Sequence, residues 1–246
     1  MSRKPTKAAV EFYETTKQSL THSKVKYQKE KQESFFLKNK IIPRTFGQGF
    51  YIDTLKESTI TICSGPAGCG KTWLVTGIAL EKLMNHEVDK ITVTKPIIEA
   101  AGESLGFLPG TVDEKVLPHF QSILDCFEDH IGPFMLQKLM QDGKIVFLPI
   151  AFLRGRDIKK SFIIADECQN MTHNGIKLLM TRISDGSIMA LNGDAEQIDL
   201  TNQKDSGLQW ALNALSGKSS DIGVVELYES DIQRHPLIST ILKYLK

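Results

Sequence analysis

From about residue 58 onward, short apolar runs rich in β-branched residues alternate with longer segments whose apolar residues recur at helical spacing. This alternation predicts an α/β fold with a parallel sheet and helices on both faces, because parallel strands are joined by crossovers that cover both sides. The expected strands are residues 59–63, 91–94, 145–148, 161–165, 187–192 and 223–227. The expected helices are residues 71–84, 113–127, 133–141, 174–183, 207–215 and 236–245, with Thr172 and Ser206 as N-cap residues.

A glycine-rich segment joins the first expected strand to the first expected helix, and it fits the phosphate-binding pattern G-x-x-x-x-G-K-[ST]. Such a loop turns successive backbone N–H groups toward one point, where the helix N-terminus adds partial positive charge. Lys71 would reach the β- and γ-phosphates, and Thr72 would ligate Mg²⁺. The residues predicted to hold the nucleotide here are Gly65, Pro66, Ala67, Gly68, Cys69, Gly70, Lys71, Thr72 and Trp73.

Two carboxylates follow the expected strand 161–165. Asp166 is predicted to hold the Mg²⁺ shell, and Glu167 to orient and deprotonate the attacking water. An ordinary solvated loop would carry the same two acids. The phosphate loop upstream and the apolar strand that leads into the acids favour the catalytic interpretation.

Further candidates follow other expected strands. Gln197 would sense the γ-phosphate or the water through its amide, whereas Asp194 would either join the water network or cap its own loop. The charge that develops on the γ-phosphate calls for a guanidinium. The candidates are Arg154, Arg156, Arg182 and Arg234. Arg234 would act within its own chain, whereas Arg154 and Arg156 lie in a long loop and would serve a neighbouring subunit or a nucleic acid.

Charge is unevenly distributed over the 246 residues, whose formal net charge is +1. Residues 1–40 carry ten Lys and Arg against four Glu, which predicts a basic N-terminal extension, helical or partly disordered, ahead of a P-loop ATPase domain at residues 41–246. Such a segment attracts nucleic acid phosphates, or merely keeps an exposed helix in solution. Without an apolar run of about 20 residues or a signal peptide, a cytoplasmic protein with no membrane contact is expected.

The cysteines and histidines suggest no further chemistry. The four cysteines form no C-x-x-C pair, so neither disulfides nor a zinc site is expected. The six histidines are spread over separate elements without paired spacing, which gives no sign of a transition-metal centre.

Taken together, the motifs resemble those of the PhoH-like ATPases, whose core is related to the first motor domain of superfamily 1 helicases. The resemblance covers about residues 41–246. It rests on Pro43–Thr45 with Gln48, Gly65–Thr72, Thr94–Pro96, Gly102–Glu103, Leu105–Gly110, Arg154–Arg156, Asp166–Thr172, Leu179–Ile183, Gly193–Asp199 and Arg234–Pro236. Lys95, Cys69 and Cys168 depart from the family's usual arginine, threonine and alanine. Lys95 keeps the charge but loses the planar fork of arginine.

The resemblance implies a P-loop NTPase fold of the RecA-like type with ATP and Mg²⁺ as its cofactors. Gln48 is similar to the glutamine with which helicase-like ATPases read adenine, which favours ATP over GTP. Relatives form ring-like homo-oligomers, often hexamers, and act on RNA or single-stranded DNA, and the short form resembles stand-alone bacterial or bacteriophage members. The alternative is an assembly module that ATP locks into a ring, with incidental turnover.

Overall fold

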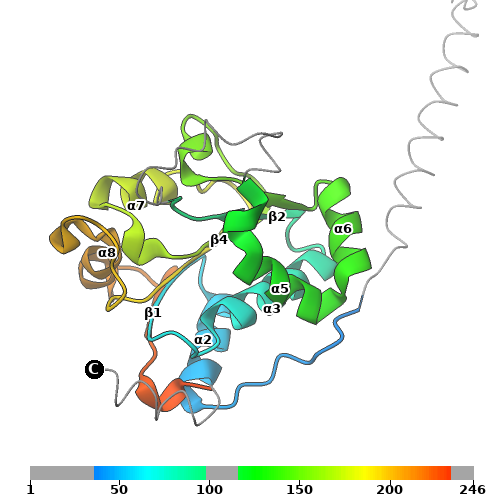
Figure 1. The fold of residues 1–246 in the computed structure, drawn as a ribbon, viewed down its shortest axis with the longest axis horizontal. Coiled ribbons are helices and arrows are strands. Elements are labelled where there is room, and N and C mark those ends of the chain that lie inside the picture. The colour runs from blue at the N-terminus through cyan, green and yellow to red at the C-terminus, as the bar shows by residue number, and fades with distance from the viewer. Residues whose placement is uncertain (1–35, 98–115, 234–246) are drawn as a thin grey trace, which may run out of the picture. The chain divides into compact units, whose positions relative to one another are not determined.

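The computed structural model describes residues 36–97 and 116–233, and the chain divides into two units at residues 36 and 37. Within the second unit, a six-stranded parallel sheet carries helices on both faces, which confirms the predicted fold class (Figure 1). Residues 1–35 lie outside the described residues, so the fold of the basic extension stays a prediction. Among the described residues, no helix is both long and apolar enough to cross a bilayer.

The sheet has the order β3-β2-β4-β5-β1-β6, and every neighbouring pair is parallel. All carboxyl ends of the strands therefore meet at one edge, and the loops that leave this edge are brought together. The strands are β1 (Ile60–Ser64), β2 (Lys90–Thr94), β3 (Ile145–Phe147), β4 (Ser161–Ala165), β5 (Ile188–Gly193) and β6 (Ile222–Glu226). Each lies within one residue of its predicted bounds.

Two groups of helices cover the sheet. The α-helices are α2 (Phe46–Glu57), α3 (Lys71–Met84), α5 (Gln121–Ile131), α6 (Pro133–Gln141), α7 (His173–Met180) and α8 (Gly207–Leu215). Short 3-10 turns are η2 (Leu117–Phe120), η3 (Ile150–Leu153), η4 (Cys168–Asn170), η5 (Gln203–Asp205) and η6 (Glu229–Asp231). Helices α7 and α8 pack on one face, and α2, α3 and α5 lie on the other (Figure 1).

The core under α7 and α8 follows from the alternation of side chains along each strand. Ile62, Ile163 and Leu191 point from three adjacent strands to this face, where they meet Ile176 of α7 and Leu208 of α8. All five side chains are buried. The packing fixes the strands whose tips carry the candidate catalytic residues.

Some predicted helix boundaries were wrong. Thr172 does cap α7, since its hydroxyl accepts a hydrogen bond from the Gly175 N–H, but α7 ends at Met180 rather than at residue 183. Ile183 instead pairs with Ile158 in a short parallel bridge, which pulls the chain out of the helix. Ser206 precedes α8 without capping it, because its hydroxyl donates to the Gln169 carbonyl at 2.8 Å.

The structure describes only part of one further predicted helix and none of another. In the region predicted as one helix over residues 113–127, the structure has η2 followed by α5, which continues to Ile131, while residues 113–115 lie outside the described ranges. The predicted helix 236–245 also lies outside them. Helix α2 was not predicted at all.

Candidate functional site

The glycine-rich loop between β1 and α3 has two residues in a backbone conformation that favours glycine. Gly68 and Gly70 have φ of 93° and 83°, a left-handed region in which side chains other than glycine are strained. Gly65 also lies close to the segment after β6, because a Cβ there would be 2.7 Å from the Leu227 Cβ. The loop leads directly into the N-terminus of α3 at Lys71, so backbone N–H groups and the helix dipole are available to an anion.

The Lys71 side chain folds back over the loop. Its Nζ donates to the carbonyls of Gly65 and Pro66 at 2.6 and 3.0 Å. The ammonium group is therefore held against the first two residues of the loop.

Thr72 and Asp166, predicted as metal ligands, come together although they follow different strands. The Thr72 hydroxyl donates to Asp166 Oδ2 at 3.2 Å. A hydroxyl and a carboxylate are hard oxygen donors, so this pair fits Mg²⁺, which would keep several waters as further ligands. Burial raises the pKa of Asp166, and the neighbouring Glu167 carboxylate raises it further, whereas a cation beside the two acids would lower it.

Glu167 has a left-handed backbone, with φ of 55° and ψ of 36°, which is unusual for a residue other than glycine. It lies between the end of β4 and the start of η4. The buried Gln169 donates from Nε2 to Glu167 Oε2 at 2.7 Å and accepts from the Asp194 N–H at 3.1 Å. Gln169 thus links the predicted base to the segment after β5.

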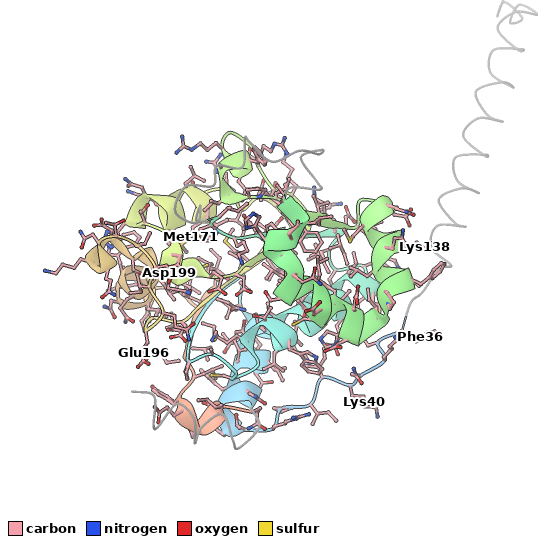
Figure 2. The ribbon with its side chains drawn as sticks, viewed as in Figure 1. Phe36, Lys40, Lys138, Met171, Glu196 and Asp199 are labelled. Carbon is pink, nitrogen blue, oxygen red and sulfur yellow. The ribbon has the colours of Figure 1, made fainter. Side chains whose placement is uncertain are left out.

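Gln197 and Glu167 line the same hollow, of about 510 Å³, at the carboxyl edge of β2, β4 and β5. Glu196 and Asp199, which are labelled in Figure 2, belong to the segment after β5 and also line this hollow. Asp194, whose role was left open, accepts from the Glu196 N–H at 3.0 Å and so caps its own turn. The hollow therefore brings an exposed amide and the predicted base to one place.

The Gln48 side chain is buried and bonded within the chain. Its Oε1 accepts from the Arg44 N–H at 2.8 Å, and its Nε2 donates to the Cys69 carbonyl at 2.9 Å. An amide nitrogen has a second hydrogen and an amide oxygen a second lone pair, so each end has one bond left for a base. Gln48 therefore lies directly beside the phosphate loop, with which it was expected to share a nucleotide.

The Trp73 ring packs against the His130 ring. The ring lies 4.3 Å from that of His130, between centroids, and the Trp73 carbonyl is 2.9 Å from His130 Nε2. Since the ring and the carbonyl of Trp73 both contact His130, only its backbone N–H would be available to a phosphate. His130 is fully buried, and its Nδ1 has no partner among the described residues.

His130 is expected to make the protein less stable in mild acid. Burial lowers its pKa, so the unfolded chain takes up a proton at about pH 6.5 whereas the folded chain does so only at lower pH. The free energy of unfolding should therefore fall as the pH drops below about 6.5. Urea denaturation from neutral to acidic pH should show a smaller fall for His130→Gln, and the exposed-site control His86→Asn should behave as the parent. An equal fall in His130→Gln would contradict this assignment.

Of the three arginine candidates that the structure describes, none bonds to the phosphate loop. Arg154 and Arg156 are exposed on the loop after η3, which follows the edge strand β3. Four strand spacings, about 19 Å, separate β3 from β1. Arg182 lies just after α7, where its guanidinium bonds locally to Leu178 and Thr181. Arg234 lies outside the described residues, although the N–H of the preceding residue, Gln233, donates to the Gly68 carbonyl at 2.9 Å.

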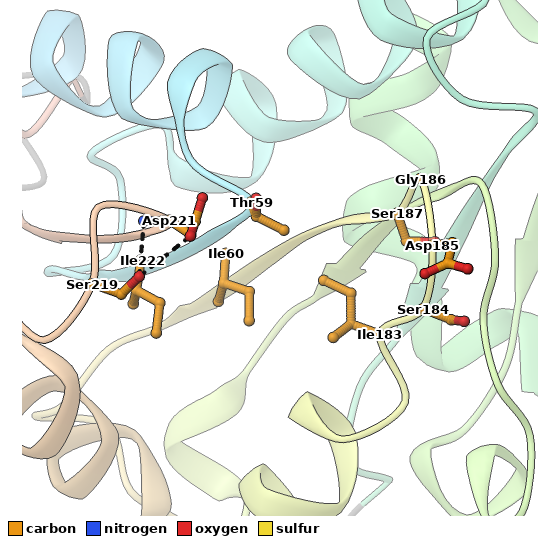
Figure 3. Close-up of a pocket in the computed structure, with 10 residues that line it drawn as sticks. All are labelled: Thr59, Ile60, Ile183, Ser184, Asp185, Gly186, Ser187, Ser219, Asp221 and Ile222. Carbon is orange, nitrogen blue, oxygen red and sulfur yellow. Dashed lines mark hydrogen bonds between the residues drawn. The ribbon is translucent and has the colours of Figure 1, made fainter.

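A second hollow, of about 460 Å³, lies at the opposite edge of the sheet, at the amino ends of β1, β5 and β6 (Figure 3). Ile60, Ile183 and Ile222 form its apolar part, and Asp185 and Asp221 its acidic part. The phosphate loop and both predicted catalytic acids are absent from its lining.

Several contacts of the site were missed from the sequence. Gln169 bonds to Glu167 two residues away but also to Asp194, 25 residues away, and this second bond gives no signal in the sequence. Asp231 bonds to Thr45 at the start of α2, at a separation of 186 residues along the chain. A contact of that range leaves no local pattern.

Comparison with known proteins identifies similar sequences. A family model described as PhoH-like protein matches residues 40–246. The chain is 40% identical over 200 residues to the PhoH-like protein of Synechocystis sp., which covers 81% of this chain and 60% of that protein. It is also 40% identical over 200 residues to the PhoH-like protein of Bacillus subtilis, covering 81% and 62%. The chain thus spans about three fifths of the length of these relatives.

Among solved structures, the large terminase from a thermophilic bacteriophage matches with a TM-score of 0.52 and 11% identity. The match covers 83% of this chain and 51% of the terminase chain. At this identity the likeness concerns the fold alone.

Proposed function

The chain belongs to the PhoH-like protein family, and from this membership and the geometry of its P-loop ATPase fold we propose that it hydrolyses ATP with Mg²⁺. The observation that carries the proposal is the 3.2 Å hydrogen bond between Thr72 and Asp166. It places the end of the phosphate loop against the acid pair after β4, so a triphosphate, a cation and a water would meet at one edge of the sheet.

Each residue would have a defined part in the reaction of ATP with water to give ADP and phosphate. Lys71 would leave the Gly65 and Pro66 carbonyls and donate to the β- and γ-phosphate oxygens. Thr72 and Asp166 would hold Mg²⁺, whose charge offsets that of the phosphates when it is bound. Glu167 would accept a proton from water, and Gln197 across the same hollow would orient that water.

The arginine that stabilises the developing charge has two candidate sources. Gln233 is bonded to Gly68, so Arg234, the next residue in the chain, is a candidate within the same subunit. Arg154 and Arg156 are exposed on the loop after η3 and make no bond to the phosphate loop of their own chain, which favours action on a neighbouring subunit of a homo-oligomeric ring. We propose that hydrolysis is coupled to RNA or single-stranded DNA, for which these two arginines would supply phosphate contacts.

The test is ATP turnover by the full chain, measured as phosphate release with and without single-stranded RNA or DNA at low and moderate salt. The expected result is Mg²⁺-dependent turnover that nucleic acid increases, with the increase lost as salt rises. Phosphate release without any response to nucleic acid would remove the coupling. If Mg²⁺ and ATP change the sedimentation of the chain without phosphate release, the protein is an assembly module instead.

A further inference from the structure

A buried carboxylate ties the start of α2 to the segment after β6. Asp231 Oδ1 accepts from the Thr45 hydroxyl at 2.5 Å, and Oδ2 accepts from the Tyr228 N–H at 2.9 Å. Asp231 is only 5% exposed, and none of the ion pairs found among the described residues involves it. Burying a carboxylate that only two neutral donors contact costs free energy, which indicates that its position serves a purpose.

Thr45 links Asp231 to Gln48 through hydrogen bonds. The Thr45 hydroxyl has one hydrogen, which goes to Asp231, and its oxygen accepts from the Gln48 N–H at 3.1 Å as the N-cap of α2. The carboxylate thus lies at the positive end of the α2 dipole. Gly47 leaves the space for it, because a Cβ there would lie 2.6 Å from both carboxylate oxygens.

The orientation of the Gln48 amide follows from its two partners. The Arg44 N–H can only donate and the Cys69 carbonyl can only accept, so Oε1 faces the former and Nε2 the latter. The Gln48 amide therefore has one N–H donor and one oxygen lone pair left for a base. Adenine offers the matching acceptor and donor at N7 and N6, whereas guanine offers two acceptors, N7 and O6.

The same segment also holds the phosphate loop, through the hydrogen bond from the Gln233 N–H to the Gly68 carbonyl. Residues 228–233 therefore hold both the helix that carries Gln48 and the loop that would bind the phosphates. We propose that Asp231 and Thr45 are positioning residues that fix Gln48 relative to the phosphate loop and so set the preference for adenine over guanine. This inference rests on the proposed ATP site.

The test compares ATP and GTP binding to the full chain by calorimetry with Mg²⁺, in a Glu167→Gln background that preserves the nucleotides. Thr45→Val removes the hydroxyl at nearly constant shape, and Gly47→Ala pushes the Asp231 carboxylate away. Both should lower the ratio of the GTP to the ATP dissociation constant by at least about fivefold. Thr45→Ser retains the hydroxyl and should retain the ratio.

Gly49→Ala is the matched control for Gly47→Ala. It makes the same change two residues further along α2, where the new Cβ would meet Pro43 at an ordinary 3.7 Å. The ratio should stay at the parent value in this control. Alanine favours helices over glycine, so a loss of selectivity confined to Gly47→Ala would not reflect a weakened helix.

Two results would overturn the inference. One is an unchanged ratio in Thr45→Val and Gly47→Ala, including the case in which both dissociation constants rise equally. The other is a parent chain that binds ATP and GTP alike; phosphate release by the chain with Glu167 intact would then still support the proposed function. If the parent binds neither nucleotide, the proposed function fails as well.

Discussion

Replacing Glu167 with glutamine should lower the rate of ATP turnover by about 10²- to 10⁴-fold while leaving ATP binding nearly unchanged. Glutamine has the same shape but cannot take a proton from water. The contacts expected for the phosphates and the cation come from Lys71, Thr72 and Asp166, which the substitution leaves in place. Phosphate release measures the loss, and calorimetric titration with Mg²⁺ and ATP measures the binding.

The control for this experiment is Glu128→Gln, the same change at an exposed position on α5. It should turn over ATP at the parent rate. Glu167 is not the base if Glu167→Gln retains turnover, or if binding and turnover disappear together in that variant.

Replacing Lys71 with alanine should weaken ATP binding by about 10- to 100-fold. A hydrogen bond to a charged phosphate is worth more than one to a carbonyl, so the ammonium group contributes more to the ATP complex than to the free loop. Calorimetric titration of Lys71→Ala against the exposed control Lys218→Ala measures the effect. An ATP affinity equal to that of the control would contradict the assignment of the phosphate loop.

The phosphate loop and the two acids were predictable because each is local in the sequence. Gly68 and Gly70 stand where φ is left-handed, and Asp166 and Glu167 directly follow an apolar strand. The parallel sheet was equally predictable, since its four central strands β2, β4, β5 and β1 are short, mostly apolar or β-branched runs that are buried on both sides after at most their first residue.

Helix α2 was missed because its own residues argue against it. Gly47 and Gly49 lower its helix propensity, and the exposed Phe46 and Phe50 blur its apolar face. The helix exists because tertiary contacts hold it: Asp231 lies at its N-terminus, and Tyr51 donates from its buried hydroxyl to Asn192 Oδ1 at 2.6 Å.

The contacts that organise the site were beyond prediction for the same reason. Gln169 bridges Glu167 to Asp194 only once β4 and β5 lie side by side. The sequence predicts Ser206 as an N-cap, yet its hydroxyl donates to the Gln169 carbonyl, a buried acceptor that needs a hydrogen-bond partner. In both cases the fold, rather than local sequence, selects the bond.

The strand order bears on how the chain is made. A ribosome delivers β1 first and β4, with the two acids that follow it, later, but β5, which separates these strands in the sheet, emerges last of the three. A nascent chain that has released β4 still lacks the strand that bridges its two halves. On the proposed function, the nucleotide site would be assembled only once β5 inserts, and uptake of ATP during synthesis would report that insertion.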